Sequence, residues 1–485
     1  MRAVSAIALW TGPATFAVIG ARVFAGDPAA PFLLVAAVLA PLLALMQRRS
    51  VASPPSLTAP EAAIAVVSAA LILWAQLLIV ADLGTALGIT RWRSLAVVAA
   101  LACIVMLVRG AGRYWAIGVP LGIAGLALPL LLIASAAEVP PWRAWAEVAS
   151  RPAFAFPADS AWVTEGRTVA RTTTLTFAEP HRVTAVQPAT YRVTERDGAV
   201  VTVRELRLAT GESVFVRSGD QLVIPAGAVV RFEAGKRVPG TAVSGIAWAS
   251  RPLGTGGDGL VEALGIAVTL CGGAVALIRR PSGSRPALAV VPALLAAFAL
   301  CAACWGIYAA HLGIELGLGA TPSIAFAEAL ALSGVHPTVA SPLTILAAAF
   351  LVLVIVTMFA TRAQIKEVAV ASVSLERRAR ARRGGDLLWL GMLAATIAAG
   401  MLALDAWRVL TTGLGLAASA WAAPRLGARR SAAWLASAAG AVAFAAFAWS
   451  AAELPLWASA VGLYPALAAA PLAWAIARMG RRRSA

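Results

Sequence analysis

Long apolar segments alternate with short polar ones along most of the chain. A helix that crosses the hydrocarbon core of a bilayer needs about 20 mostly apolar residues. Twelve segments come close to this length, at roughly 3–24, 31–46, 61–82, 94–108, 115–137, 260–278, 286–310, 342–361, 387–404, 407–423, 432–450 and 455–478. The pattern therefore predicts a polytopic α-helical membrane protein with about 12 transmembrane helices.

Two of these predictions have an alternative. Residues 387–423, taken as one helix, would be about 55 Å long, which is too long for a core about 30 Å thick. We therefore expect a hairpin at Asp405-Ala406-Trp407-Arg408. Segment 3–24 follows a basic start at Arg2 and could be a cleaved signal peptide, but its length and the Gly12-Pro13 break favour an uncleaved helix.

The composition excludes a soluble multidomain enzyme and a disordered chain. Of the 485 residues, 60% are hydrophobic and 13% are charged, and the mean hydropathy is +0.82. Soluble domains have about 45–50% apolar and about 25% charged residues. The net charge of +17 does not indicate nucleic acid here, because basic residues gather in the cytoplasmic loops of membrane proteins.

The placement of the arginines predicts the orientation of the helices. With a cytoplasmic N-terminus, 22 basic residues fall on the cytoplasmic side and only Arg22, Arg91, Arg93 and Arg408 fall in short outer loops. This asymmetry follows the positive-inside rule. Arginine outnumbers lysine 38 to 2, which is typical of a GC-rich bacterial genome. We expect a multi-pass protein of the bacterial cytoplasmic (inner) membrane with both termini in the cytoplasm; Arg91 and Arg93 are exceptions for which the sequence offers only headgroup contact.

Residues 138–259 break the apolar pattern, with 14 of the 40 basic and 12 of the 23 acidic residues. Polar and apolar residues alternate with period two in short runs, at 172–177, 191–194, 200–208, 212–216, 221–224 and 229–232. Turn residues such as Asp197-Gly198 separate these runs, as in antiparallel sheets. We therefore predict an inserted extracytoplasmic all-β domain, a small barrel or sandwich. In its first tether, Trp142 and Trp145 fit anchors at the membrane interface.

The predicted organisation thus has three parts. Residues 1–137 form membrane helices 1–5, residues 138–259 form the extracytoplasmic β-rich domain with its tethers, and residues 260–485 form membrane helices 6–12. The two helical parts show no clear internal repeat, which weakens the case for a transporter built from inverted repeats.

Cys301 and Cys304 are the first candidates for chemistry. Two thiols three residues apart can be redox-active or bind a metal. No second Cys-x-x-Cys completes a tetrahedral site, and buried cysteine often behaves as a small apolar residue, so packing is the favoured interpretation. The four cysteines all lie in apolar segments, which excludes a disulfide-stapled secreted domain.

The segment 311–340 holds the other candidates. His311 and His336 bracket it and could share a metal or haem, although polar residues at a membrane surface are the simpler interpretation. If this Gly- and Pro-broken segment is re-entrant, Glu315 and Glu328 line a cavity; if it lies on the surface, they do not. No cofactor is predicted.

Charge elsewhere narrows the function. Acidic residues deep in the predicted helices are scarce, which argues against an ion-driven pump. The basic run at 376–383 fits either a patch for anionic lipid or ordinary determinants of orientation. Asp27 is a weak match to the catalytic acid of a membrane glycosyltransferase, because Asp-Pro is common in turns.

The sequence therefore favours a non-enzymatic integral membrane component of a bacterial envelope assembly, export or respiratory-associated complex. Its helices would lie in the lipid bilayer, its β-domain would bind a protein partner outside the cytoplasm, and it would bind no nucleic acid. A transporter or lipid-handling permease is the alternative. A redox- or haem-handling factor, or a glycosyltransferase-like enzyme, is the third interpretation.

Overall fold

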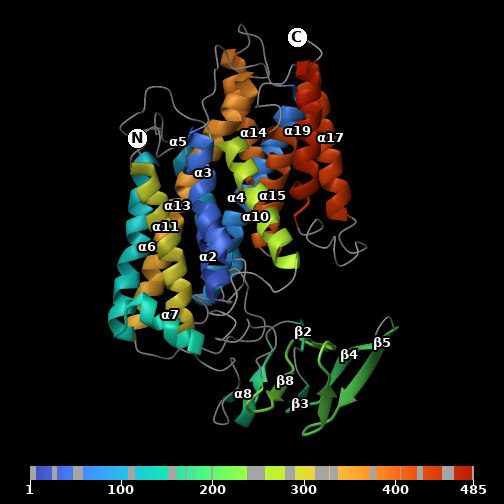
Figure 1. Cartoon of the computed structure of the whole chain (residues 1–485). Helices are drawn as coiled ribbons and strands as arrows, with labels where there is room; N and C mark the ends of the chain where they lie inside the picture. Colours follow the sequence, from blue (N-terminus) through green and yellow to red (C-terminus); the bar gives the residue numbers. More distant parts are fainter. Residues whose placement is uncertain are drawn as a thin grey trace.

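The computed structural model is mostly helical, with a small antiparallel β region at one end of a helical bundle (Figure 1). It describes residues 7–24, 30–46, 58–107, 115–150, 161–169, 172–177, 180–197, 200–236, 257–278, 290–311, 327, 337–371, 378–402, 404, 406–422, 430–449 and 464–482.

Helices occupy all twelve of the predicted apolar segments. Before the β region they are α2 (Pro13–Phe24), α3 (Ala30–Met46), α4 (Ala59–Ala86), α5 (Arg91–Leu107) and α6 (Trp115–Ala137). After it they are α10 (Gly257–Leu277), α11 (Val290–His311), α13 (Pro337–Ala371), α14 (Arg378–Ala399), α15 (Ala406–Leu416) with the π-helix η5 (Ala417–Ala422), α17 (Arg430–Trp449) and α19 (Ala466–Arg482). The break between α14 and α15 confirms that residues 387–423 do not form one helix. The predicted hairpin position is wrong, because Ala406, Trp407 and Arg408 already belong to α15 and the described turn is at Gly400–Leu402; Asp405 lies outside the described residues.

Five of these helices are long and apolar enough to cross a membrane. They contain the stretches Ala59–Thr85, Ile117–Ser135, Val290–His311, Leu343–Val370 and Ala432–Trp449. The others are shorter or more polar: α5 has 17 residues and begins with Arg91, and α14 begins with an arginine-rich turn. By length and composition the described helices therefore support a membrane protein with five clear spans.

The helices on the two sides of the β region pack into one bundle. Helix α2 contacts α11, α3 contacts α10, α4 contacts α15, and α6 contacts α13. Glycines allow close approach, since a Cβ on Gly118 or Gly122 of α6 would lie 2.4 Å from a side-chain carbon of Val356 or Leu353 of α13. At the centre, the ring of Phe16 lies edge-on to the rings of Phe298 and Phe350, each 5.6 Å away.

Helix α2 lies inside this bundle. Every residue from Pro13 to Phe24 is buried except Arg22. Gly306 of α11 faces its backbone so closely that a Cβ there would lie 2.4 Å from the carbonyl oxygen of Gly20. Helix α2 therefore fills the centre of the bundle, and its retention as an uncleaved helix stays a prediction.

The β region consists of two four-stranded sheets with antiparallel pairing throughout. Their strand orders are β1-β8-β3-β6 and β2-β7-β4-β5. The strands are β1 (Arg167–Thr168), β2 (Thr173–Thr176), β3 (His181–Ala185), β4 (Ala189–Asp197), β5 (Val200–Leu208), β6 (Ser213–Val216), β7 (Gln221–Ile224) and β8 (Val229–Phe232). Side chains of both sheets form one apolar core, separate from that of the bundle, which includes Phe177, Tyr191, Leu222 and Phe232. The prediction of a small antiparallel β structure is confirmed, and the sandwich is the better description of it.

Two short helices connect the bundle to the sheets. Helix α7 (Pro141–Ser150) packs against α11 at the end of the bundle that faces the β region, and α8 (Ala161–Thr164) packs on β8 (Figure 1). On α7, Ala144 is buried, Trp145 is half-buried and Trp142 is exposed. The expectation that both tryptophans lie at a membrane interface stays a prediction.

Candidate functional site

Cys301 and Cys304 are free thiols on α11. Cys301 is buried and Cys304 half-buried in the main apolar core, beside Trp305, whose indole Nε1 donates to the carbonyl of Leu126 at 3.0 Å. Across the described part of the chain, no three His, Cys, Asp or Glu side chains are grouped so that they could hold a metal ion. The surroundings of both thiols are those of packing residues.

His181 and His311, the two histidines within the described residues, lie in separate parts of the structure. His311 is the half-buried last residue of α11, whereas His336, Glu315 and Glu328 lie outside the described residues. His181 is fully buried in the β region, where its Nε2 accepts a hydrogen bond from the main-chain N–H of Glu233 at 3.1 Å. Its ring packs between Phe177 and Phe232, so His181 contributes to the core of the sandwich.

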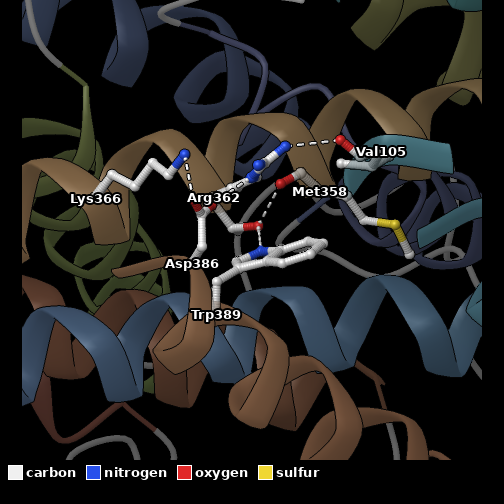
Figure 2. Close-up of polar contacts among 7 residues, drawn as sticks. Val105, Met358, Arg362, Lys366, Asp386 and Trp389 are labelled. Atoms are coloured by element: carbon white, nitrogen blue, oxygen red, sulfur yellow. Dashed lines mark hydrogen bonds and ion pairs between the residues drawn. The ribbon is translucent and has the colours of Figure 1, made fainter. Parts of the chain in front are cut away.

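Among the described residues of the bundle, one polar group is the Asp386 cluster, formed by Asp386 of α14 with Arg362 and Lys366 of α13 (Figure 2). Arg362 Nε lies 2.8 Å from Asp386 Oδ1, and Lys366 Nζ lies 2.7 Å from Oδ2. Partial burial alone would raise the pKa of Asp386, but hydrogen bonds and charge from Lys366 and Arg362 outweigh it and lower the pKa below its ordinary value. The carboxylate therefore stays ionised and holds two cations.

The Asp386 cluster also reaches a third helix. Arg362 Nη1 donates to the main-chain carbonyl of Val105, in the last turn of α5, at 2.7 Å. One turn further along α14, the indole of Trp389 donates to Thr361 Oγ1 at 3.2 Å, as Figure 2 shows. A cation at the C-terminal end of a helix interacts favourably with its dipole, so Arg362 stabilises the end of α5 as well as the α13–α14 contact.

A second group, the Asp82 cluster, has the same construction. Arg91, the first residue of α5, forms an ion pair with Asp82 of α4. Its Nε donates to the carbonyl of Gly400 at 2.7 Å and its Nη2 to that of Leu402 at 3.2 Å, just beyond the end of α14. Arg91 thus has a structural role, which corrects the expectation that headgroup contact alone explains this arginine. The guanidinium of Arg93, by contrast, lies over the ring of Trp92, 5.5 Å from its centroid.

The two clusters hold opposite ends of the same pair of helices. Each uses an arginine to join a carboxylate to a carbonyl at the C-terminal end of another helix, α5 in one case and α14 in the other. Sequence reasoning missed both, because each contact spans more than 250 residues. Two features of the sequence could have indicated these clusters. Asp386 is a single aspartate directly after a basic run, and Arg91 is a basic residue in a loop predicted to lie outside the cytoplasm.

A third polar contact lies deep in the bundle, where α2 begins. The side chain of Gln76 is fully buried on α4, and its Oε1 accepts a hydrogen bond from the N–H of Ala14 at 2.7 Å. Its Nε2 has no partner among the described residues. A Cβ at position 12 would lie 2.5 Å from Gln76 Oε1, so a larger residue there would displace the buried amide of Gln76. Gln76 therefore caps a helix that starts inside the bundle.

In the β region, strand β5 is an edge open to a partner. Among the described strands it pairs with β4 alone, and it is one of four edge strands, with β1, β2 and β6. Val201 and Val203 are each more than half exposed on it. Ion pairs between Arg192 and Glu205 and between Arg204 and Glu195 join the two strands. The β4–β5 hairpin is thus a long, braced ribbon with a free outer edge.

No protein-family model matches the sequence, and no curated protein matches it either.

Proposed function

We propose that the protein is a non-enzymatic integral component of a bacterial envelope complex, and that its β region binds a protein partner outside the cytoplasm. In this proposal all twelve apolar segments cross the cytoplasmic membrane, because the shorter apolar helices pack in the same bundle as the five long ones. Both termini then lie in the cytoplasm.

One observation carries this proposal: the β region and the basic helix ends lie at opposite ends of the bundle. The arginine-rich start of α14 and the end of α19, which carries Arg478, are at one end, and α7 and the sheets are at the other (Figure 1). Basic residues accumulate on the cytoplasmic side of membrane proteins. The basic end would therefore be cytoplasmic and the β region outside.

The polar clusters favour a supporting role for the bundle. Asp82, Asp386 and their arginines are engaged in holding helix ends, and Gln76 holds the start of α2. The free edge of β5, by contrast, offers unpaired main-chain groups and exposed valines, and such an edge can pair with a strand of another protein. We therefore place partner binding on β5.

Topology fusions test the orientation. Reporters at Ser284, Ala371 and Ser484 should score as cytoplasmic, and a reporter at Thr210 should score as outside. A cytoplasmic score at Thr210 would overturn the orientation and with it the proposed function.

Site-specific crosslinking tests the partner. A photoreactive residue at Val203 should give a discrete adduct in intact cells, and the change Val203→Lys should abolish binding because a charge on an edge strand blocks strand pairing. The matched control is a photoreactive residue at Arg217, which is exposed in the same region but lies between β6 and β7. Equal adducts at both positions, or none at Val203, would contradict a binding edge at β5.

One observation favours the alternative of a transporter or lipid-handling permease. Helices that begin within a membrane bundle are typical of transporter binding sites, and α2 begins in this way beside the unpartnered amide nitrogen of Gln76. In that case Gln76→Leu would abolish transport and leave the Val203 adduct unchanged.

A further inference from the structure

One face of α14 is uncovered in the described part of the chain, from its arginine-rich start onward. The exposed residues on it follow at intervals of three or four, which is the spacing of one helix face: Arg380, Arg383, Leu387, Gly391 and Ala394. The opposite face packs on α13, where a Cβ on Gly385 would lie 3.1 Å from Cα of Lys366. Helix α14 is therefore fixed to the bundle by one side and open on the other.

The open face changes from basic to apolar within one turn. Arg383 is exposed, and Leu387, about 6 Å further along the axis, is 70% exposed. Leu388 and Leu390 beside it are also exposed. A guanidinium next to a row of leucines matches the two parts of a phospholipid, a charged headgroup and an acyl chain.

The charge at this boundary is in excess. The described side chains of 362–370 and 380–386 include five basic residues and two acidic ones, Glu367 and Asp386, which gives +3. Asp386 is already shared by Arg362 and Lys366. None of the described carboxylates forms an ion pair with Arg380, Arg382 or Arg383.

The position of these arginines does not serve the helix itself. They lie in the first two turns of α14, whose first turn contains no acidic residue. The N-terminal end of a helix carries partial positive charge, which is unfavourable for cations and favourable for anions. An anion bound between the arginines would relieve this repulsion.

We propose that the open face of α14 binds a phospholipid with an anionic headgroup, with its phosphate at Arg380, Arg382 and Arg383 and its acyl chain along Leu387 and Leu390. This inference rests on the proposed location in a membrane. It goes beyond the role of these arginines in setting orientation, since orientation requires the charges but no preference for a lipid.

Retained lipids test the proposal. The full-length protein is reconstituted in vesicles with equal parts of phosphatidylglycerol and phosphatidylcholine, extracted in mild detergent, and its lipids are measured by mass spectrometry. The wild-type protein should retain phosphatidylglycerol in excess of the bulk ratio. The triple change Arg380→Gln, Arg382→Gln and Arg383→Gln should reduce this preference by about fivefold or more, the factor that corresponds to one arginine near an anionic surface.

Two controls separate local binding from general charge. Replacing Arg182, Arg207 and Arg217 by Gln removes the same charge from exposed positions of the β region and should leave the preference unchanged. Replacing the three α14 arginines by Lys keeps the charge and should preserve the preference. A glutamine triple variant that still prefers phosphatidylglycerol as strongly as the wild type would overturn the proposal. So would a wild-type protein that binds soluble glycerol phosphate as tightly as it binds phosphatidylglycerol.

A second measurement does not depend on the variants. Photoactivatable phosphatidylglycerol should label α14 of the wild-type protein more strongly than α6, where Leu121 and Leu128 are also exposed. Equal labelling of the two helices would overturn the proposal and leave the proposed function intact. If washing with alkaline carbonate released the protein from membranes, both this proposal and the proposed function would be overturned.

Discussion

Arg91 and Asp82 form an ion pair that joins the end of α4 to the start of α5. The side chain of Asp82 is 4% exposed and that of Arg91 17%. Through the same guanidinium, α4 and α5 are connected to the carbonyl of Gly400, 309 residues later in the chain. The pair therefore fixes helices from both sides of the β region at the end of the bundle nearest to the sheets.

Removing the carboxylate of this pair should destabilise the bundle. Asp82→Asn leaves Arg91 largely buried without a counter-charge, and we expect the free energy of unfolding to fall by about 3 kcal/mol. Equilibrium unfolding in micelles measures it. The matched control is Glu195→Gln, which breaks the exposed pair with Arg204 and should change stability little. Equal losses in both variants would contradict a structural role for the Asp82 cluster.

A methyl group at position 12 should disturb the start of α2. Gly12→Ala places a Cβ against the buried amide of Gln76, and we expect a loss of about 1–3 kcal/mol in stability. Gly391→Ala is the control, because its Cβ meets nothing within 4 Å and alanine favours a helix by about 1 kcal/mol. If Gln76→Ala in the Gly12→Ala background restores no stability, the clash is not the cause.

The β region should fold without the bundle. Its core is separate, and every internal strand of both sheets has its partners within the region. Expressed alone, residues 160–252 should be soluble and give a β-rich circular dichroism spectrum. A helical or unfolded spectrum would contradict this prediction.

Tyr191 should make the β region sensitive to alkali. Burial raises the pKa of Tyr191 above its ordinary value of 10.0, and its hydroxyl has no partner among the described residues. Stability is therefore complete below about pH 10 and falls as the pH rises further, because the folded state resists ionisation. Tyr191→Phe should remove this dependence and stabilise the region by about 1 kcal/mol.

The same substitution at another tyrosine provides the control. Tyr308 donates its hydroxyl hydrogen to the carbonyl of Val139 at 2.9 Å, so Tyr308→Phe should destabilise the full-length protein. Thermal unfolding of both variants measures whether each substitution raises or lowers the stability. Destabilisation by Tyr191→Phe would indicate a partner for its hydroxyl outside the described residues.

The cysteines of α11 should be dispensable. If Cys301 and Cys304 only pack, changing both to Ala costs modest stability and leaves the crosslinked adduct at Val203 unchanged, because small residues suit helix interfaces in membranes. Loss of the adduct in Cys304→Ala alone, at an unchanged protein level, would revive the redox interpretation.

The local elements could be predicted from the sequence because each depends on its own pattern. Helices form in the twelve apolar segments, and strands form in all six alternating runs. Strand β3 was not predicted. Its three buried positions are His181, Val183 and Ala185, and a histidine at the first of them hides the apolar alternation. Which helices pack together was beyond local patterns, and so were both arginine clusters, because a contact between Arg362 and Val105 has no trace within either segment.

The buried position of α2 has a consequence for the order in which the protein is assembled. At about 5–20 residues per second, a ribosome needs about 15–60 s to proceed from Phe24 to the end of α11, which packs on α2. Helix α13, which supplies Phe350 to the ring of Phe16, follows later still. During this interval α2 can pack only on α3 and α4, so lipid or the insertion machinery has to cover its remaining sides. A chain that ends before α11 would therefore expose this apolar centre, and membrane quality control would recognise the exposed surface and remove the chain.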